Sequence, residues 1–414
     1  MSNSAPVITV FEHQLLRIGD APQGVPFDEG YWQTLVRLHP VLPRSCYTLT
    51  HRGIRFSHYV GVLKTPRFTV EILPKADAHP TPAVWRQLLV EMVATCSSRA
   101  VHHTADAIPS FRAGALLEVY LLDFITHVER LCRQGLIKQY RPVAENSLTA
   151  KGRLRFSEHV RRNAVHQERF FVEHAAHSID HPLHQLLKRA LQLVAQASSN
   201  ASIRQRARRL LHHLAAVSDV SVAQLQAMKV TYHRHTARYR LSVTAAQQLL
   251  SASFSHMYHG VTHQGFALLL DMNLLFEEFV CRRLERLSAS HGFTVRRQTT
   301  QSLWGSVKVR PDILVEFSDG RKNVVVDTKW KVLTEPRPLA EDLHQIYVYN
   351  QLFEARRGIL LYPQVHDLSG QQHRFTGPGC SFAEVHFIAI ADQQSARISP
   401  KLDQSLLQLL ESPF

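Results

Sequence analysis

The sequence has few cysteines and no long apolar run, and these absences exclude several classes of protein. Its five cysteines are scattered along 414 residues without any Cys-x-x-Cys pair, which argues against a disulfide framework, a zinc ribbon and an iron–sulfur cluster. We expect them to be reduced and half buried. No apolar stretch reaches the length of a membrane span and no signal peptide is recognisable, so we expect a soluble cytoplasmic protein without membrane contact.

Several catalytic motifs are missing as well. There is no Gly-x-x-x-x-Gly-Lys-Ser/Thr loop, so the chain should not hydrolyse nucleotides by itself. The His-Glu-x-x-His and Gly-x-Ser-x-Gly motifs of metalloproteases and serine hydrolases are absent too. The 26 histidines include pairs such as His102–His103, His174–His177 and His212–His213. No cysteine or carboxylate partners converge on them, and we interpret them as surface or packing residues.

Positive charge is concentrated in the first two thirds of the chain. Residues 261–414 carry 17 Lys plus Arg and 17 Asp plus Glu, so the net charge of +14 comes from the 31 basic and 17 acidic residues of 1–260. A basic region of this kind favours a polyanionic partner, because Lys and Arg displace counterions from phosphate backbones. Charge that only keeps the protein soluble is the alternative.

Hydrophobic periodicity divides the chain into three predicted domains. Residues 1–80 are β-rich and 81–260 are mainly helical and basic, whereas 261–414 mix helices and strands. The prediction is therefore a mixed α+β protein. Within it we expect strands at 7–11 and 45–75, helices at 85–96, 115–136, 181–198, 201–217, 267–287 and 341–355, strands at 293–299, 305–317, 324–326, 358–363 and 383–391, and a linker with a docking segment at 228–265.

The C-terminal region contains a constellation of charges on two neighbouring strands. Arg310-Pro311-Asp312 opens one strand, and Val324-Val325-Val326-Asp327-Thr328-Lys329 forms the next, after a Ser318-Asp319-Gly320 turn. On antiparallel neighbours the two aspartates can lie side by side, and Asp327 and Lys329, two residues apart, point to the same face. Carboxylate oxygens suit Mg²⁺ or Mn²⁺, which can activate water and stabilise a phosphodiester transition state. Lys329 would orient or deprotonate that water, or pair with the phosphate.

Two other interpretations of these charges are open. A surface hairpin with solvated charges fits poorly, because three valines precede Asp327 and should lie deep in the sheet. A structural ion pair is the second alternative, since such networks also perturb pKa values.

Further residues are expected to serve the same site. Glu277 is a candidate third carboxylate, in preference to Glu278, although a solvated helix face is nearly as good an interpretation. Gln345 and Tyr349 are four residues apart on one helix face, where they brace the ligands or touch DNA, or simply fill the core. The expected metal ligands are thus Asp312, Asp327, Glu277 and Thr328. Candidate DNA-binding residues are Lys331 and Arg310 beside the site, and Lys151, Arg153, Arg155, Arg161 and Arg162 in the basic region; Trp330 is expected to flank the DNA path together with Lys331.

With these motifs in place, the chain resembles the McrC family, the nuclease subunits of McrBC-type, modification-dependent restriction systems with a PD-(D/E)xK catalytic domain. The similar segments recur in order along most of the chain. They are Val60-Gly61-Val62 with Phe68 to Lys75, Lys151-Gly152-Arg153-Leu154, Asp180-His181-Pro182-Leu183-His184, Leu275-Phe276-Glu277, Arg310-Pro311-Asp312, Val326 to Lys331, Leu343-His344-Gln345-x-Tyr347-x-Tyr349 and Gly358 to Pro363. His184 departs from the asparagine usual in the family, which puts the local helix packing in question.

The resemblance implies a C-terminal restriction-endonuclease-like domain with a central mixed sheet flanked by helices. It also implies that Asp312, Asp327 and Lys329 are catalytic, with Glu277, Gln345 and Tyr349 as helpers. The chain would then cut methylated or otherwise modified DNA as the partner of an McrB-type AAA+ GTPase ring, whose GTPase it stimulates, and residues 1–80 would dock on that ring. The alternatives are a stand-alone nuclease of the RecB/Cas4 kind, and a non-enzymatic scaffold that bridges DNA and a partner.

Overall fold

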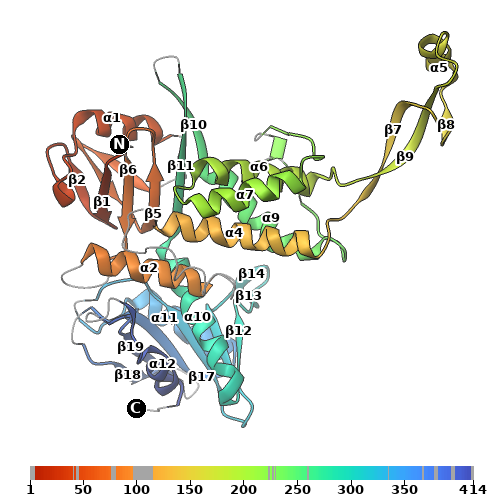
Figure 1. Cartoon of the computed structure of the whole chain (residues 1–414). Helices are drawn as coiled ribbons and strands as arrows, with labels where there is room; N and C mark the ends of the chain where they lie inside the picture. Colours follow the sequence, from red (N-terminus) through yellow and green to blue (C-terminus); the bar gives the residue numbers. More distant parts are fainter. Residues whose placement is uncertain are drawn as a thin grey trace. The chain divides into compact units, whose positions relative to one another are not determined.

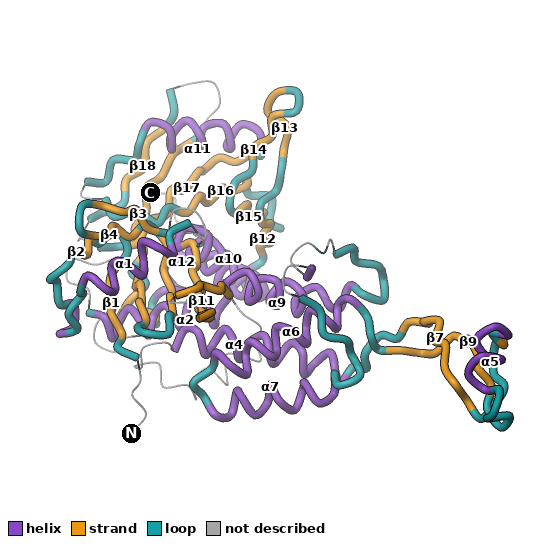
Figure 2. The backbone as a smooth tube through the Cα atoms, turned by 90° about the horizontal axis from the view of Figure 1, so that it is seen from above, coloured by secondary structure: helices purple, strands orange, loops and turns teal. Residues whose placement is uncertain are grey.

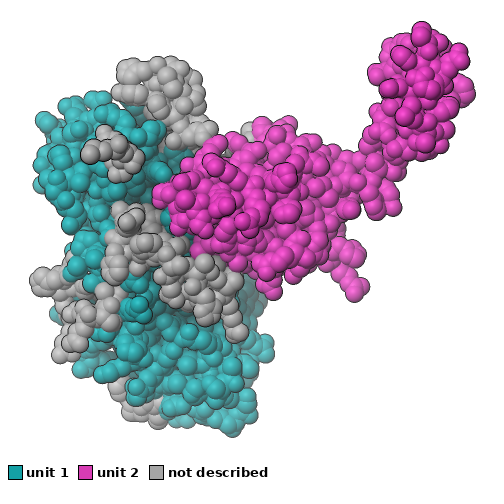
Figure 3. Space-filling model, in the orientation of Figure 1, with its two compact units in different colours: residues 1–120, 253–414 teal, residues 121–252 magenta. Residues whose placement is uncertain are grey.

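The computed structural model describes most of the chain, in two compact units. The described residues are 5–40, 42, 46–75, 81–96, 115–221, 224–225, 228, 230–258, 261–333, 335–365, 368–376, 381–392 and 397–411. One unit combines Met1–Tyr120 with Ser253–Phe414, and the other is Leu121–Ala252 (Figure 3). No helix in the described ranges is both long and apolar enough to cross a bilayer. The four described cysteines are free, while Cys380 lies outside the described residues.

The first unit begins with a five-stranded sheet in the order β1-β6-β5-β11-β10. Only β1 and β6 are parallel; the other neighbours are antiparallel. A smaller sheet, β2-β4-β3, and helix α1 pack on it around a core that includes Ile8, Phe27, Phe56 and Phe68. The bounds are β1 Val7–Phe11, β2 Leu15–Arg17, η1 Pro22–Gly24, α1 Glu29–Leu38, β3 Tyr47–Thr50, β4 Gly53–Phe56, β5 Tyr59–Lys64, β6 Thr69–Leu73, β10 Ser253–Tyr258 and β11 Val261–Asp271.

The strands β10 and β11 correct two sequence predictions. The expected helix over 267–287 was wrong for its first turn, because residues 261–271 form β11 and pair with β5. The helix α10 (Met272–His291) begins only after Asp271, whose side chain accepts a hydrogen bond from the N–H of Asn273. A run such as Ala267-Leu268-Leu269-Leu270 suits a buried strand as well as a helix, so periodicity alone could not decide. The predicted linker over 228–265 was wrong too, since it contains α9 and both strands.

The C-terminal part of the first unit is built on a six-stranded mixed sheet in the order β12-β15-β16-β17-β19-β18. Strands β15 and β16 are antiparallel, whereas β16, β17 and β19 are parallel. Helix α11 packs on β16 and β17, and α12 on β19 (Figure 1). This arrangement confirms the predicted mixed sheet flanked by helices. The bounds are α2 Pro82–Cys96, β12 Phe293–Arg297, β13 Gln301–Trp304, β14 Val307–Val309, β15 Ile313–Phe317, β16 Asn323–Thr328, α11 Ala340–Leu352, β17 Ala355–Pro363, β18 Gln371–Arg374, β19 Phe382–Ile388, β20 Ala391–Asp392, β21 Arg397–Ile398 and α12 Leu402–Glu411.

Alternation along β16 decides which face carries the candidate site. Val325 belongs to the core under α11, together with Leu314, Ile346 and Leu360. Side chains two residues apart point to the same face of a strand, so Asp327 emerges on the α11 side. The close approach of α11 to the sheet requires Gly358 on β17, because a Cβ there would collide with the side chain of Ile346 and lie 2.7 Å from Asn350 Oδ1.

The second unit is a helical bundle with a sheet of three strands, β7-β9-β8. Helices α6 and α7 confirm the predictions for 181–198 and 201–217. His184, the departure from the family pattern, is fully buried, with Nδ1 2.5 Å from Ile179 O and Nε2 2.9 Å from Tyr239 Oη. Both ring nitrogens are therefore satisfied. The bounds are α4 Ala115–Arg133, which starts in the first unit, β7 Gln139–Ser147, β8 Arg153–Leu154, α5 Phe156–Asn163, β9 Phe170–Ser178, α6 Pro182–Ala197, α7 Ala201–His213, η2 Ala237–Tyr239 and α9 Arg240–Ala252 (Figure 2).

Candidate active site

Two aspartates meet where β15 begins and β16 ends. The antiparallel register pairs Ile313 with Val326, so the next position along brings Asp312 opposite Asp327. Asp327 is 1% exposed. Burial raises the pKa of Asp327, and the neighbouring charge of Asp312 raises it further. The two carboxylates thus lie close enough to repel each other in a place with little solvent to screen them.

Thr328 fixes the orientation of Asp312. Its N–H and its hydroxyl both donate to Asp312 Oδ2, at 2.8 and 3.0 Å. Burial raises the pKa of Asp312 above its usual range, although these two hydrogen bonds favour the ionised form. The Thr328 hydroxyl therefore serves as a donor to the carboxylate rather than as a free ligand, and Asp312 Oδ1 is left for another partner.

Lys329 lies between two carboxylates and an amide. Its Nζ is 2.8 Å from Asp327 Oδ2 and 3.3 Å from Asp342 Oδ1, and it donates to Gln345 Oε1 at 3.1 Å. Burial by itself lowers the pKa of Lys329, but the charges of Asp327 and Asp342 outweigh that effect and hold the pKa above its usual value. The surrounding carboxylates thus favour the ammonium form of Lys329.

The helix α11 completes the surroundings of the lysine. Gln345 Nε2 donates to Tyr349 Oη at 2.7 Å, and the Tyr349 hydroxyl donates to the carbonyl oxygen of Arg310 at 3.0 Å. A chain of hydrogen bonds thus runs from Lys329 through Gln345 and Tyr349 to the backbone two residues before Asp312. The structure brings Gln345 and Tyr349 to the site in a bracing position, and Tyr349 is also part of the core.

Glu277 and Glu278 point to different surroundings. Glu277 Oε1 accepts from Gln298 Nε2 at 2.8 Å, and its pKa is raised by burial and by the charge of Asp312. Glu278 instead pairs with Arg282 and Arg297. The charge of Asp312 thus acts on Glu277.

The candidate DNA-binding residues occupy two separate places. Arg310 and Lys331 are exposed beside the aspartates, with Lys331 Nζ 3.9 Å from Asp342 Oδ2. Trp330 differs from the expectation that it would flank a DNA path, because it is only 7% exposed. The other five, Lys151, Arg153, Arg155, Arg161 and Arg162, are all exposed on the β7-β9-β8 sheet and α5 of the second unit, and three of them are engaged: Lys151 with Glu145, Arg155 with Glu158, and Arg162 over the ring of Phe171.

The donor set suits a hard divalent cation. Asp327 Oδ2 is buried without a hydrogen bond of good geometry, held only by the charge of Lys329, and Asp312 has one oxygen free of hydrogen bonds to Thr328. In the described part of the chain no three His, Cys, Asp or Glu side chains are grouped as a ready-made metal site. Two adjacent carboxylates are nevertheless what Mg²⁺ ordinarily takes from a protein, because it keeps most of its waters and binds substrate phosphate.

Two residues of the site were missed at the sequence level. Asp342 is 7% exposed and faces Lys329, and its spacing of three residues from Gln345 could have revealed it as part of the same helix face. Gln298, with φ of 47°, lies between Glu277 and the Asp312 backbone, donating its N–H to Asp312 O at 3.1 Å. Nothing in the sequence indicates that this glutamine has a left-handed backbone conformation.

Comparison with known proteins agrees with the resemblance drawn from the motifs. The family model described as "McrBC 5-methylcytosine restriction system component" matches residues 54–363. No curated protein sequence matches the chain. The fold is similar to a chain of the refined half-complex from a tetradecameric assembly of Thermococcus gammatolerans McrB AAA+ hexamers with bound McrC, with a TM-score of 0.65 and 18% identity, over 98% of this chain and 99% of that one. A chain of the cryo-EM structure of the Thermococcus gammatolerans McrBC complex aligns over 70% of this chain and 89% of its own, at 20% identity and a TM-score of 0.48. Since the family match covers well over half of the sequence, the chain belongs to the family of McrBC 5-methylcytosine restriction system components.

Proposed function

We propose that this chain is the endonuclease subunit of a modification-dependent restriction complex and hydrolyses DNA phosphodiester bonds with Mg²⁺ or Mn²⁺. The observation that carries the proposal is the position of Lys329 Nζ, 2.8 Å from the buried Asp327 and close to Asp312, where β15 begins and β16 ends. The carboxylates of Asp312 and Asp327 form a buried pair of like charges. Burying such a pair costs stability, and a purely structural role gives no reason to keep it. Membership of the McrBC family supports the same interpretation.

Each side chain then has a defined task. Asp312 and Asp327 would hold the cation, with Glu277 as an outer carboxylate. When bound, a divalent cation lowers the pKa of a water molecule and offsets the extra negative charge of the transition state. Lys329 remains protonated, and so it orients the attacking water or pairs with the scissile phosphate. Gln345 and Tyr349 hold the Lys329 side chain and the Arg310 backbone in position through hydrogen bonds.

The decisive test compares Asp327→Asn with Asp319→Asn. Both changes remove one carboxylate, but Asp319 is exposed in the turn between β15 and β16 and pairs only with Arg321 within the described structure. We expect Asp327→Asn to reduce cleavage of 5-methylcytosine DNA by at least about 100-fold, the scale of a lost transition-state contact, and Asp319→Asn to cut normally. Retained cleavage by Asp327→Asn would refute the assignment of the site.

We propose further that cleavage takes place in complex with an McrB-type AAA+ GTPase, which this chain binds and stimulates. The family match and the likeness in fold to a complex of McrB hexamers with bound McrC support this partner. The test is co-purification with such a GTPase, followed by GTP turnover with and without this chain. Efficient cutting by the isolated chain with Mg²⁺ alone would favour the stand-alone nuclease instead.

A further inference from the structure

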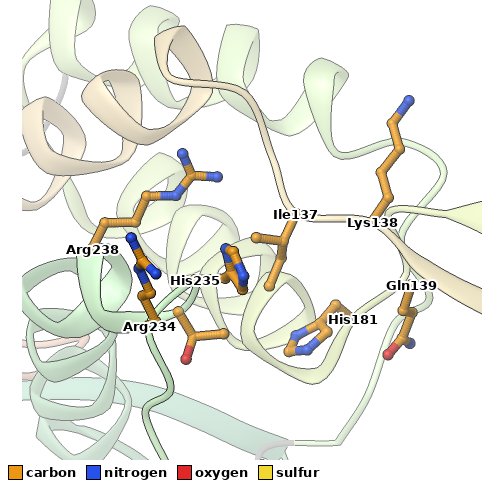
Figure 4. Close-up of a pocket in the computed structure, with 8 residues that line it drawn as sticks. Ile137, Lys138, Gln139, His181, Arg234, His235 and Arg238 are labelled. Atoms are coloured by element: carbon orange, nitrogen blue, oxygen red, sulfur yellow. The ribbon is translucent and has the colours of Figure 1, made fainter.

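The second unit contains a pocket with an unusual concentration of positive charge. Its volume is about 600 Å³, and it is bounded by three segments: the entry into β7, the N-cap of α6 and the turn before α9 (Figure 4). Eight residues line it, among them the permanent cations Lys138, Arg234 and Arg238 and the histidines His181 and His235. None of the eight is a carboxylate.

Hydrogen bonds tie the segments of the pocket wall together. Tyr239, which is fully buried, accepts from the N–H of Ile137 at 3.0 Å, and its hydroxyl is 2.9 Å from His184 Nε2. Arg238 donates to Gly135 O at 2.8 Å and to Gln134 O at 3.3 Å. These contacts join the β7 entry to the turn before α9, so the lining side chains project from a fixed frame.

The remaining polar side chains of the lining are also oriented. His181 Nδ1 accepts from the N–H of Leu183 at 3.2 Å, which leaves Nε2 as the nitrogen available to a ligand. Thr236 Oγ1 accepts from the N–H of His233 at 2.7 Å. Gln139 Nε2 donates to Asp180 O at 2.7 Å. Asp180 is an acidic residue that directly precedes His181 of the pocket. Its carboxylate already accepts hydrogen bonds from Arg141, Gln185 and Ser218.

The charge of the pocket therefore has no acidic partner among the residues that line it. A concave site focuses the potential of like charges, and an anion placed there relieves their repulsion. The planar guanidinium of an arginine such as Arg234 is suited to phosphate oxygens, and a lysine adds a point charge. The volume is in the range of small-molecule sites, so it exceeds one phosphate and suits a nucleotide unit.

We propose that this pocket binds phosphate groups of a nucleic-acid strand, as a DNA contact outside the candidate active site. The choice of a strand over a free nucleotide rests on the proposed nuclease function, whereas the phosphate chemistry follows from the pocket alone. The pocket residues are distinct from the basic residues of β8 and α5, and they are not needed for hydrolysis.

The test measures binding of the full chain to a fluorescein-labelled 20-nucleotide DNA by anisotropy, in EDTA so that no cleavage occurs. The variant Lys138→Gln/Arg234→Gln removes two exposed pocket cations. The matched control is Arg208→Gln/Arg209→Gln, which removes two exposed cations from α7 of the same unit. We expect the pocket variant to bind DNA about ten-fold more weakly. The slope of log Kd against log salt concentration should fall by about two, the value for two lost phosphate contacts. The control should change Kd by less than about two-fold.

Three results would overturn the proposal. Equal weakening by both variants would mean that binding follows net charge, and unchanged binding by the pocket variant would mean that DNA does not enter the pocket. Displacement of the DNA by micromolar GTP or ATP would make a free nucleotide the source of the phosphate. Circular dichroism and thermal melting verify that both variants fold, and Asp327→Asn is expected to bind DNA normally in EDTA. Retained cleavage by Asp327→Asn would thus refute the nuclease assignment, whereas unchanged DNA binding by the pocket variant would refute the pocket.

Discussion

Trp330 donates its indole N–H to Glu12 Oε1 at 2.8 Å, although the two residues are 318 positions apart in the sequence. Glu12 follows β1 of the N-terminal sheet, and its Oε1 also accepts from the N–H of Lys75 at 2.7 Å. The Trp330 ring packs edge-on against Trp85 and Phe276. Trp330 comes directly after Lys329, so the N-terminal sheet helps to fix the backbone on which the lysine is carried.

The buried carboxyl group of Glu12 predicts a pH dependence of stability. Burial raises the pKa of Glu12 from 4.5 to about 7, although the hydrogen bonds from Lys75 and Trp330 oppose the shift. Between these two values the unfolded chain has lost the proton and the folded chain still keeps it. The free energy of unfolding therefore falls as pH rises through this window, by at most about 3 kcal/mol from this group.

The variant Glu12→Gln should remove that slope. Glutamine keeps an acceptor for Trp330 and Lys75 but does not titrate. From pH 5 to pH 8 the free energy of unfolding should therefore fall in the wild type by more than it does in the variant. Urea denaturation at several pH values measures it. Glu29→Gln, an exposed change on α1, is the control and should leave the slope as it is. Parallel pH profiles for Glu12→Gln and wild type would contradict the prediction.

The second prediction concerns Asp342 as a positioning residue for Lys329. Asp342 helps to raise the pKa of Lys329, so Asp342→Asn should lower that pKa. If the ammonium form is needed, the alkaline limb of the pH–rate profile of DNA cleavage should move to lower pH. We expect a loss of about 10-fold in kcat at neutral pH, the lower range for a displaced charged group. Glu341→Gln, on the exposed side of α11, should keep the wild-type profile. A uniform loss of activity without a shift of the alkaline limb would mean that Asp342 acts only on structure.

Local patterns were sufficient to predict the two strands of the candidate site. Three valines before Asp327, a turn at Ser318-Asp319-Gly320 and a two-residue spacing to Lys329 determine strand, register and face without any distant contact. Gln345 and Tyr349 followed from helical spacing in the same way.

The remaining features depend on distant contacts that leave no local trace. Trp330 has an ordinary strand context, and only the packing of Trp85 and the carboxyl of Glu12 make it a buried residue rather than a DNA contact. Ala267 to Leu270 form a strand because β5 offers them a partner about 200 residues away in the chain. Tertiary structure thus decides whether an apolar run becomes a strand or a helix. It also decides whether a tryptophan is buried or exposed.

The third prediction is a conflict between stability and metal binding at Asp327. The pKa of Asp327 is raised by burial and by Asp312 despite the nearby Lys329, so its ionised form is a net cost to the fold. Asp327→Asn resembles the neutral form and should raise the free energy of unfolding at pH 8 by about 1 kcal/mol or more, since a tenfold change in an acid dissociation constant corresponds to about 1.4 kcal/mol. Millimolar Mn²⁺ should raise the Tm of the wild type and not that of the variant. Equal stabilisation of both proteins by Mn²⁺ would place the cation elsewhere.

The last prediction tests the hydrogen-bond chain through Tyr349. The change Tyr349→Phe keeps the ring in the core beneath α11 but removes the hydroxyl that donates to Arg310 O and accepts from Gln345. Two half-buried polar groups then lose their partner, so we expect a loss of about 1–2 kcal/mol in the free energy of unfolding. Cleavage should fall by only a few-fold, because Lys329 keeps its contacts with Asp327 and Asp342. Tyr347→Phe removes a hydroxyl from the same helix without breaking the chain from Lys329 to Arg310, and serves as the comparison in both assays. If Tyr349→Phe abolished cleavage while leaving stability unchanged, the tyrosine hydroxyl would be acting on substrate, and its assignment as a brace for the β15 entry would be wrong.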